Sequence, residues 1–135
     1  HLQQLQSLNI GSNNLEGPIH ESLDNLSKLE SLDLSQNAFE GSLPRSLVEL
    51  TKLEYLHLDF NKFTGTLPSP LNFLLNRVNV TLAGNLFSGT IPELDGSIVE
   101  TFNTEYIDWS SNEFVGTIPV VLGELSFLKY LDLSK

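Results

Sequence analysis

Cysteine and methionine are both absent from this chain of 135 residues. Without cysteine, the chain forms no disulfide and offers no thiolate nucleophile. The compartment is left open by this absence, because segments outside this sequence could carry the disulfides of a secreted protein.

Basic residues are scarce: 7 Lys and Arg stand against 17 Asp and Glu, which gives a net charge of −10. A chain this acidic is repelled by a phosphate backbone and by an anionic lipid surface, which argues against nucleic acid and membrane surfaces as partners. No apolar run approaches the length of a membrane span, and no signal peptide opens the sequence. We therefore expect no direct membrane insertion of this segment.

Aromatic residues make up only 9% of the chain, whereas 40% of its residues are hydrophobic, which suits a core of stacked leucines. The apolar residues recur in a frame of Leu-x-Leu, Asn, Phe or Leu, Gly and Pro. Its copies are Leu8–His20, Leu32–Pro44, Leu56–Pro68, Val80–Pro92 and Ile107–Pro119, and a further copy begins at Leu131. The length predicts a single domain, residues 1–135, of about five and a half repeats.

The asparagine of the frame sets its period. Asn13, Asn37, Asn61 and Asn85 follow one another by 24 residues, and Asn112 comes after a further 27. A fixed period of this length is typical of a solenoid, in which each repeat buries its apolar face against its neighbours. The Leu-x-Leu segments alternate apolar and polar residues, so they predict short strands that stack into one parallel sheet.

Three further features of the frame are predicted to be structural. The Asn side chain can donate and accept hydrogen bonds, so it can satisfy backbone groups at the bend after each strand. The Phe column is expected to stack as an aromatic spine, and the Gly column to mark tight or left-handed backbone. The spine comprises Leu15, Phe39, Phe63, Phe87 and Phe114, and the glycines are Gly17, Gly41, Gly65, Gly89 and Gly116.

The return side of each repeat carries leucines spaced near three, such as Leu23, Leu26 and Leu29. This spacing predicts a short helical or 3₁₀ segment there. The frame weakens between residues 72 and 106, and three extra residues lie before Ile107. For the irregular stretch 93–106 we expect a bulged convex loop or a slightly longer helix.

The frame resembles the plant-type leucine-rich-repeat family, whose pattern LxxLxxLxLxxNxLxGxIPxxLGxL is closely matched by Leu50–Pro68 and Ile107–Leu125. The resemblance covers essentially the whole chain. It implies a leucine-rich-repeat solenoid of the α/β class, with a curved parallel sheet on the concave face and short helical or 3₁₀ segments on the convex face. It also implies a second small sheet, for which the pairs Thr66-Leu67, Thr90-Ile91 and Thr117-Ile118 look suitably extended.

Both ends of the sequence fall inside the repeat frame, without the polar or disulfide-bonded caps that solenoids normally use for solubility. We therefore expect a piece of a longer repeat protein.

Polar residues between the inward leucines are expected to face solvent on the concave side of the sheet. Acidic residues are enriched there, and tyrosines add aromatic area of the kind that anchors interfaces. The candidate ligand-binding residues are Glu30, Asp33, Glu54, Tyr55, His57, Asp59, Phe60, Tyr106, Asp108, Tyr130 and Asp132. In the fourth repeat, the corresponding solvent-facing positions include Asn79, Thr81, Ala83 and Gly84. The alternative is an ordinary solvated acidic surface.

Strands about 4.8 Å apart place Glu30 beside Glu54, and Asp108 beside Asp132. Like charges at this distance repel and favour a Lys or Arg of a partner. A calcium site is a weaker interpretation, because no acidic loop has metal-ligand spacing. No metal and no cofactor are expected.

Glu105 beside Lys129 is predicted to be an intramolecular ion pair. Catalysis has little support, because paired carboxylates need an enclosed, dry pocket to separate their pKa values. His57 is the one candidate general base, near Asp33 and Asp59 by repeat geometry, but no nucleophile is placed beside it. We expect no catalytic residues and no enzyme activity.

The leading hypothesis is a non-enzymatic protein-recognition module of an extracellular or cell-surface receptor-like ectodomain, whose concave face binds a protein or basic peptide. The alternatives are a structural or assembly repeat of a larger complex, and a secreted inhibitor of a cell-wall-degrading enzyme. The sequons Asn25-Leu26-Ser27 and Asn79-Val80-Thr81 are glycosylation sites if the chain is secreted. Asn25 is expected on the convex surface and Asn79 on the concave sheet.

Overall fold

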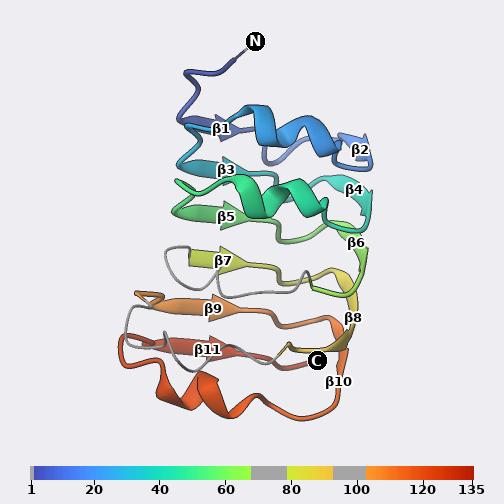
Figure 1. Ribbon diagram of the computed structural model, residues 1–135. Coiled ribbons are helices and arrows are strands. Elements are labelled where there is room, and N and C mark those ends of the chain that lie inside the picture. The colour runs from blue at the N-terminus through green and yellow to red at the C-terminus, as the bar shows by residue number, and fades with distance from the viewer. Residues whose placement is uncertain (1, 68–78, 93–102) are drawn as a thin grey trace.

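The computed structural model, which describes residues 2–67, 79–92 and 103–135, is a solenoid of stacked repeats (Figure 1). Each repeat adds one short strand to a six-stranded parallel sheet in the order β1-β3-β5-β7-β9-β11. The strands are β1 (Ser7–Asn9), β3 (Ser31–Asp33), β5 (Tyr55–His57), β7 (Asn79–Thr81), β9 (Tyr106–Asp108) and β11 (Tyr130–Asp132). The sheet predicted from the Leu-x-Leu segments is thereby confirmed.

A second parallel sheet lies along one side of the solenoid, in the order β10-β8-β6-β4-β2 (Figure 1). Its strands are β2 (Glu16–Gly17), β4 (Ala38–Gly41), β6 (Lys62–Gly65), β8 (Leu86–Thr90) and β10 (Glu113–Val115). The predicted second sheet is therefore present, and Thr90 ends its strand β8. The pairs Thr66-Leu67 and Thr117-Ile118 were wrongly placed in it. The strands begin just after the Asn column instead, and positive φ at glycines such as Gly65 (φ 81°) turns the chain out of the extended region.

The described part of the return side consists of short 3₁₀ helices, as predicted. These are η1 (Glu21–Asn25), η2 (Arg45–Glu49) and η4 (Val120–Glu124). Leu71 and Leu74 of the third repeat lie outside the described residues. So does the irregular stretch except for residues 103–106, which lead into β9.

The core lies between the six-stranded sheet and the return segments. The first leucine-type residue of each central strand is completely buried, as are Phe63 and Phe87. The rings of Phe39, Phe63 and Phe87 stack with centroid distances of 6.2 and 6.1 Å, which confirms the middle of the spine. Its ends were predicted wrongly: Leu15 is 42% exposed, and the ring of Phe114 packs tilted against Trp109 with the centroids 6.3 Å apart.

The Asn column ties each repeat to the one before it. The side-chain amide of Asn61 donates to the carbonyls of Leu34 (3.0 Å) in the preceding repeat and Leu58 (3.1 Å) in its own. Its Oδ1 atom accepts from the Phe39 backbone N–H at 3.0 Å. Asn85 and Asn112 repeat this arrangement, so the prediction that these side chains satisfy backbone groups is confirmed.

Candidate functional site

The candidate ligand-binding residues lie on or beside the strands of the six-stranded sheet, on its solvent-facing, concave side. They fall into two groups, because β7 contributes none of them. One group lies along β3 and β5 and comprises Glu30, Asp33, Glu54, Tyr55, His57, Asp59 and Phe60. The other lies on β9 and β11 and comprises Tyr106, Asp108, Tyr130 and Asp132.

Three of the aspartates form local turns with the serine two residues later. Oδ1 of Asp33 accepts from the Ser35 backbone N–H at 3.0 Å and from its hydroxyl at 2.7 Å. Asp108 makes the same pair of bonds to Ser110, at 3.1 and 2.7 Å. Because Oδ1 is used within the turn, each of these carboxylates is held in one orientation.

Asp132 forms the third turn, with Ser134, and also interacts with Tyr130. Oδ1 of Asp132 accepts from the Ser134 backbone N–H at 2.9 Å, and this bond is the main cause of a lowered Asp132 pKa. The Tyr130 hydroxyl donates to Asp132 Oδ2 at 3.3 Å. Partial desolvation of the phenol, followed by the negative charge of Asp132, raises the pKa of Tyr130 to about 12.

His57 and Asp59 belong to a hydrogen-bonded chain that crosses from β5 to β7. The Thr81 hydroxyl donates to Asp59 Oδ2, and Oδ1 of Asp59 accepts from the Ala83 backbone N–H at 3.0 Å. The Thr81 hydroxyl lies 2.9 Å from His57 Nδ1. Since its single proton points to Asp59, the hydroxyl accepts from His57, which assigns the Nδ1-protonated form to that ring.

The fourth repeat differs from the prediction that its small residues face solvent. Thr81 and Ala83 are only 9% and 6% exposed, and both are hydrogen-bonded to Asp59 of the preceding repeat. The Phe60 ring lies over Gly84, where an added Cβ would come within 2.7 Å of Phe60 Cδ1. The sequence analysis did not predict that Thr81 and Ala83 are buried. The signal that could have indicated it is their small size compared with the equivalent residues of the preceding repeat, His57 and Asp59.

Two tyrosines of the second group form a stacked pair on the sheet. The rings of Tyr106 and Tyr130 are 4.4 Å apart between centroids and inclined by only 6°. Tyr106 is 38% and Tyr130 41% exposed, so each ring keeps an accessible surface. With Tyr55 and Phe60, also exposed, they confirm the expectation that aromatic area faces solvent here.

The predicted charge pairs have different outcomes. Glu30 and Glu54 come directly before the register partners Ser31 and Tyr55, so they lie in equivalent places of neighbouring repeats, as predicted. Glu30 Oε1, however, accepts from the side-chain amide of Gln6 at 3.1 Å, just before β1 on the other side. The ion pair between Lys129 Nζ and Glu105 Oε2 is confirmed at 2.8 Å. Asp108 and Asp132 are register partners on β9 and β11, as predicted.

Within residues 2–67, 79–92 and 103–135, no three His, Asp or Glu side chains meet in a way that could hold a metal ion. No helix in those ranges combines the length and apolar character that a bilayer crossing requires.

The two sequon asparagines have different surroundings. Asn25 ends η1 on the convex side and is exposed, and its Nδ2 donates to the Ser22 carbonyl at 2.9 Å. Asn79 begins β7 on the concave sheet and is only half-exposed. Its Oδ1 atom is buried and accepts no hydrogen bond.

The repeat frame, the two parallel sheets and the Asn ladder define a leucine-rich-repeat protein. The family model described as leucine rich repeat matches residues 2–63. Together with the solved structures below, this match shows that the chain has a leucine-rich-repeat fold and is similar to the plant-type leucine-rich-repeat family. No curated protein sequence matches the chain significantly.

The similar solved structures include ectodomains of plant receptor kinases. One is the ectodomain of the Arabidopsis receptor kinase HAESA with an N-terminally extended IDA peptide hormone, at 32% identity and a TM-score of 0.85 over 97% of this chain. Another is the SOBIR1 ectodomain from Arabidopsis thaliana, at 28% identity and a TM-score of 0.82 over 94% of this chain and 67% of that one. A third is PEPR1 with AtPEP1, at 33% identity and a TM-score of 0.83 over 93% of this chain. The chain spans only 21% of the HAESA chain and 17% of the PEPR1 chain.

Proposed function

We propose that this chain is a protein-recognition module of a receptor-like ectodomain, and that its concave sheet binds a protein or basic peptide. The observation that carries this proposal is the exposed aromatic area beside oriented carboxylates on one face. Tyr55, Tyr106 and Tyr130 supply rigid contact area, and aromatic residues of this kind are enriched in the energetically important part of interfaces.

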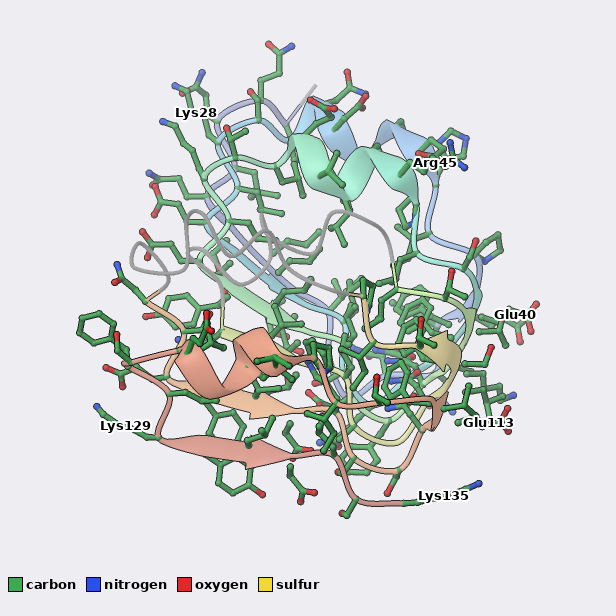
Figure 2. All side chains as sticks on the ribbon, turned by 60° about the horizontal axis from the view of Figure 1, so that its bottom comes forward. Lys28, Glu40, Arg45, Glu113, Lys129 and Lys135 are labelled. Atoms are coloured by element: carbon green, nitrogen blue, oxygen red, sulfur yellow. The ribbon has the colours of Figure 1, made fainter. Side chains whose placement is uncertain are left out.

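The charge of the face favours a basic partner. Glu54 is exposed, and its carboxylate has no partner among the described residues. Lys129 directly precedes Tyr130, and its charge is paired with the carboxylate of Glu105. The labelled basic residues, Lys28, Arg45, Lys129 and Lys135, lie far apart around the outline of the molecule in Figure 2. A positively charged partner is therefore steered towards the acidic face.

Similar solved structures support the same class of function. The HAESA structures hold the peptide hormone IDA, and one of them also contains the co-receptor SERK1. The RGFR1 structure is that of a plant peptide hormone receptor with RGF2. The HAESA and SOBIR1 structures are ectodomains of receptor kinases, so we also propose an extracellular or cell-surface location for this chain.

The geometry around His57 supports the expectation that this is not an enzyme. A hydroxyl nucleophile is activated when its proton is directed to a base. Here the Thr81 hydroxyl directs its proton to Asp59 and accepts from His57, so His57 does not activate it. Thr81 is also only 9% exposed, and it lies on strand β7 of the six-stranded sheet.

A random peptide library displayed on phage tests the proposal, because selection from it does not require the ligand to be identified first. Peptides selected on the 135-residue chain are expected to be enriched in Arg and Lys and to bind less tightly at high salt, because exposed charges are screened over about 10 Å at 0.1 M. Glu54→Lys should weaken binding by about tenfold, which corresponds to ~1.4 kcal/mol.

The matched control is Glu113→Lys, which makes the same charge change on β10 of the second sheet. Glu113 projects from the side of the molecule opposite Lys129 (Figure 2), so this variant should leave affinity almost unchanged. Equal losses in both variants would remove the concave face as the binding site. Salt-independent binding by peptides without basic residues would contradict the choice of a basic partner.

A further inference from the structure

One repeat position on the concave sheet carries a column of tyrosines that is interrupted once. Tyr55 on β5 pairs in register with Asn79 on β7, and Tyr106 on β9 pairs with Tyr130 on β11. The β7–β9 pairing of Val80 with Ile107 places Asn79 opposite Tyr106. Figure 1 shows the four strands stacked in this order. Asn79 therefore occupies the one place in this column between tyrosines where a ring is missing.

The spacing at this place suits one planar group. Between β9 and β11, one strand step holds two stacked rings with their centroids 4.4 Å apart. Two strand steps of about 4.8 Å each separate the backbones of Tyr55 and Tyr106, or roughly 10 Å in all. A planar group above Asn79 would thus lie at a stacking distance from both rings. Tyr55 and Tyr106 are 46% and 38% exposed, so their side chains are accessible to it.

The charges around this place distinguish among planar groups. The unpartnered carboxylate of Glu54 immediately precedes Tyr55. Asp108 lies on the strand of Tyr106, and its Oδ1 accepts from Ser110, which leaves Oδ2 without a partner among the described residues. A phenyl ring would stack but leave these carboxylates unpaired, and an ammonium group is not planar. A guanidinium group stacks on aromatic faces, donates several hydrogen bonds and carries a positive charge.

We propose that the sheet receives an arginine side chain of its partner between Tyr55 and Tyr106, above Asn79. This inference rests on the proposed function and names the side chain that the concave face recognises. The guanidinium stacks between the two rings, and its charge is balanced by the carboxylates of Glu54 and Asp108.

The probe is the capped tripeptide acetyl-Gly-Arg-Gly-amide, titrated into the isotopically labelled chain and followed by NMR. One side chain alone is expected to bind weakly, with a dissociation constant on the order of 1 mM. Nuclear Overhauser contacts should join the arginine methylenes to the rings of Tyr55 and Tyr106. The citrulline peptide, which is planar but uncharged, should bind about tenfold more weakly.

Two variants each add a tyrosine ring to the column, one at the proposed arginine position and one outside it. Asn79→Tyr fills it and should abolish the arginine contacts. Ser31→Tyr adds the same bulk one strand beyond Tyr55, on β3, and should preserve them. Should Asn79→Tyr fail to fold, Asn79→His places a smaller ring at the same position and should weaken binding several-fold.

The outcomes distinguish this inference from the proposed function. Arginine contacts at Tyr55 and Tyr106 that Asn79→Tyr removes and Ser31→Tyr keeps would support the inference. Contacts elsewhere on the sheet, equal binding of the citrulline peptide, or loss in both ring variants would overturn it. In those cases the library experiment with Glu54→Lys and Glu113→Lys still decides whether the concave face binds a partner.

Discussion

At the residue scale, positions that are equivalent in the repeat frame differ in what they contribute. Phe63 and Leu15 occupy the same column, yet Phe63 is completely buried and Leu15 is 42% exposed. Phe63 also stacks with Phe39 and Phe87. Column membership therefore indicates the direction of a side chain, whereas its contribution to stability depends on repeats packed on both sides.

Truncation of Phe63 tests this difference. Phe63→Ala should lower the free energy of unfolding by about 3–5 kcal/mol, because it removes a buried ring and leaves a cavity. The same truncation at the same column position, Leu15→Ala, should cost under about 1 kcal/mol, as expected of a surface site. Urea denaturation measures both. A small loss for Phe63→Ala would contradict the spine assignment.

Alkaline titration tests the surroundings of Tyr130. Its pKa is raised to about 12 from a usual value of 10.0, so the folded state disfavours the phenolate. This contribution to stability is complete below the usual value and is lost as the pH rises towards 12. Ultraviolet titration of the folded chain should show one late-ionising tyrosine, which Tyr130→Phe removes. Asp132→Asn should lower its pKa, and an unchanged value would exclude Asp132 as a cause.

At the element scale, neighbouring repeats contact each other closely through the glycine column. Gly89 has a φ of +79°, and a Cβ added there would lie 2.8 Å from Thr66 Cγ2 in the preceding repeat. Gly17 has a similar φ of +88°, but an added Cβ would have no atom within 4 Å. The same backbone conformation thus occurs with and without a close neighbour.

Alanine substitutions at these two glycines separate backbone strain from crowding. Gly17→Ala should cost roughly 1–2 kcal/mol, because only the left-handed conformation opposes it. Gly89→Ala should cost about 1–3 kcal/mol more, because the new methyl also overpacks the contact with Thr66. Thr66→Ser in the Gly89→Ala background removes that methyl contact and should recover much of the difference in thermal and urea unfolding. Equal costs at both glycines would show that crowding contributes nothing.

The sequence predicted the elements well where a single periodicity determines them. Alternation around leucine pairs such as Leu56 and Leu58 is enough to place the strands and their inward faces. The second sheet was misplaced because its position depends on Asn Oδ1 atoms bonding to the N–H of the preceding repeat, as from Asn61 to Phe39. Such contacts between repeats leave no local pattern.

The candidate site was predictable to a similar extent. Alternation places Tyr55, Tyr106 and Asp108 on one face, and the structure shows them there. It does not indicate which carboxylate oxygens are already used, because the Asp108–Ser110 turn is a side-chain bond. Nor does it show that Thr81 is covered by its neighbours, since burial on a sheet depends on the sizes of adjacent side chains.

At the scale of the whole molecule, the two sequons lie on opposite faces. Asn25 is exposed on the convex side, where a glycan would leave the sheet free. Asn79 is half-exposed between Tyr55 and Tyr106, where a glycan would cover the proposed arginine site.

Glycosylation of the secreted protein should follow this geometry. We expect Asn25 to be occupied and Asn79 largely bare in mass spectrometry of glycopeptides from a plant or other eukaryotic secretory host. Asn25→Gln should then remove most of the glycan mass without affecting peptide binding. A bare Asn25 would take away this support for a secreted location, and full occupancy of Asn79 would move the binding site off the middle of the sheet.

The Asn ladder determines how the solenoid would respond to mechanical tension. Asn61, Asn85 and Asn112 each bond to their own repeat and to the one immediately before it. Force applied at the two ends therefore acts on these hydrogen bonds between repeats in series, and we expect the repeats to separate one after another. Each opening frees one repeat of 24 residues, or roughly 80 Å of extended chain at about 3.5 Å per residue. Pulling single molecules should accordingly give a series of small steps of that length instead of one large rupture.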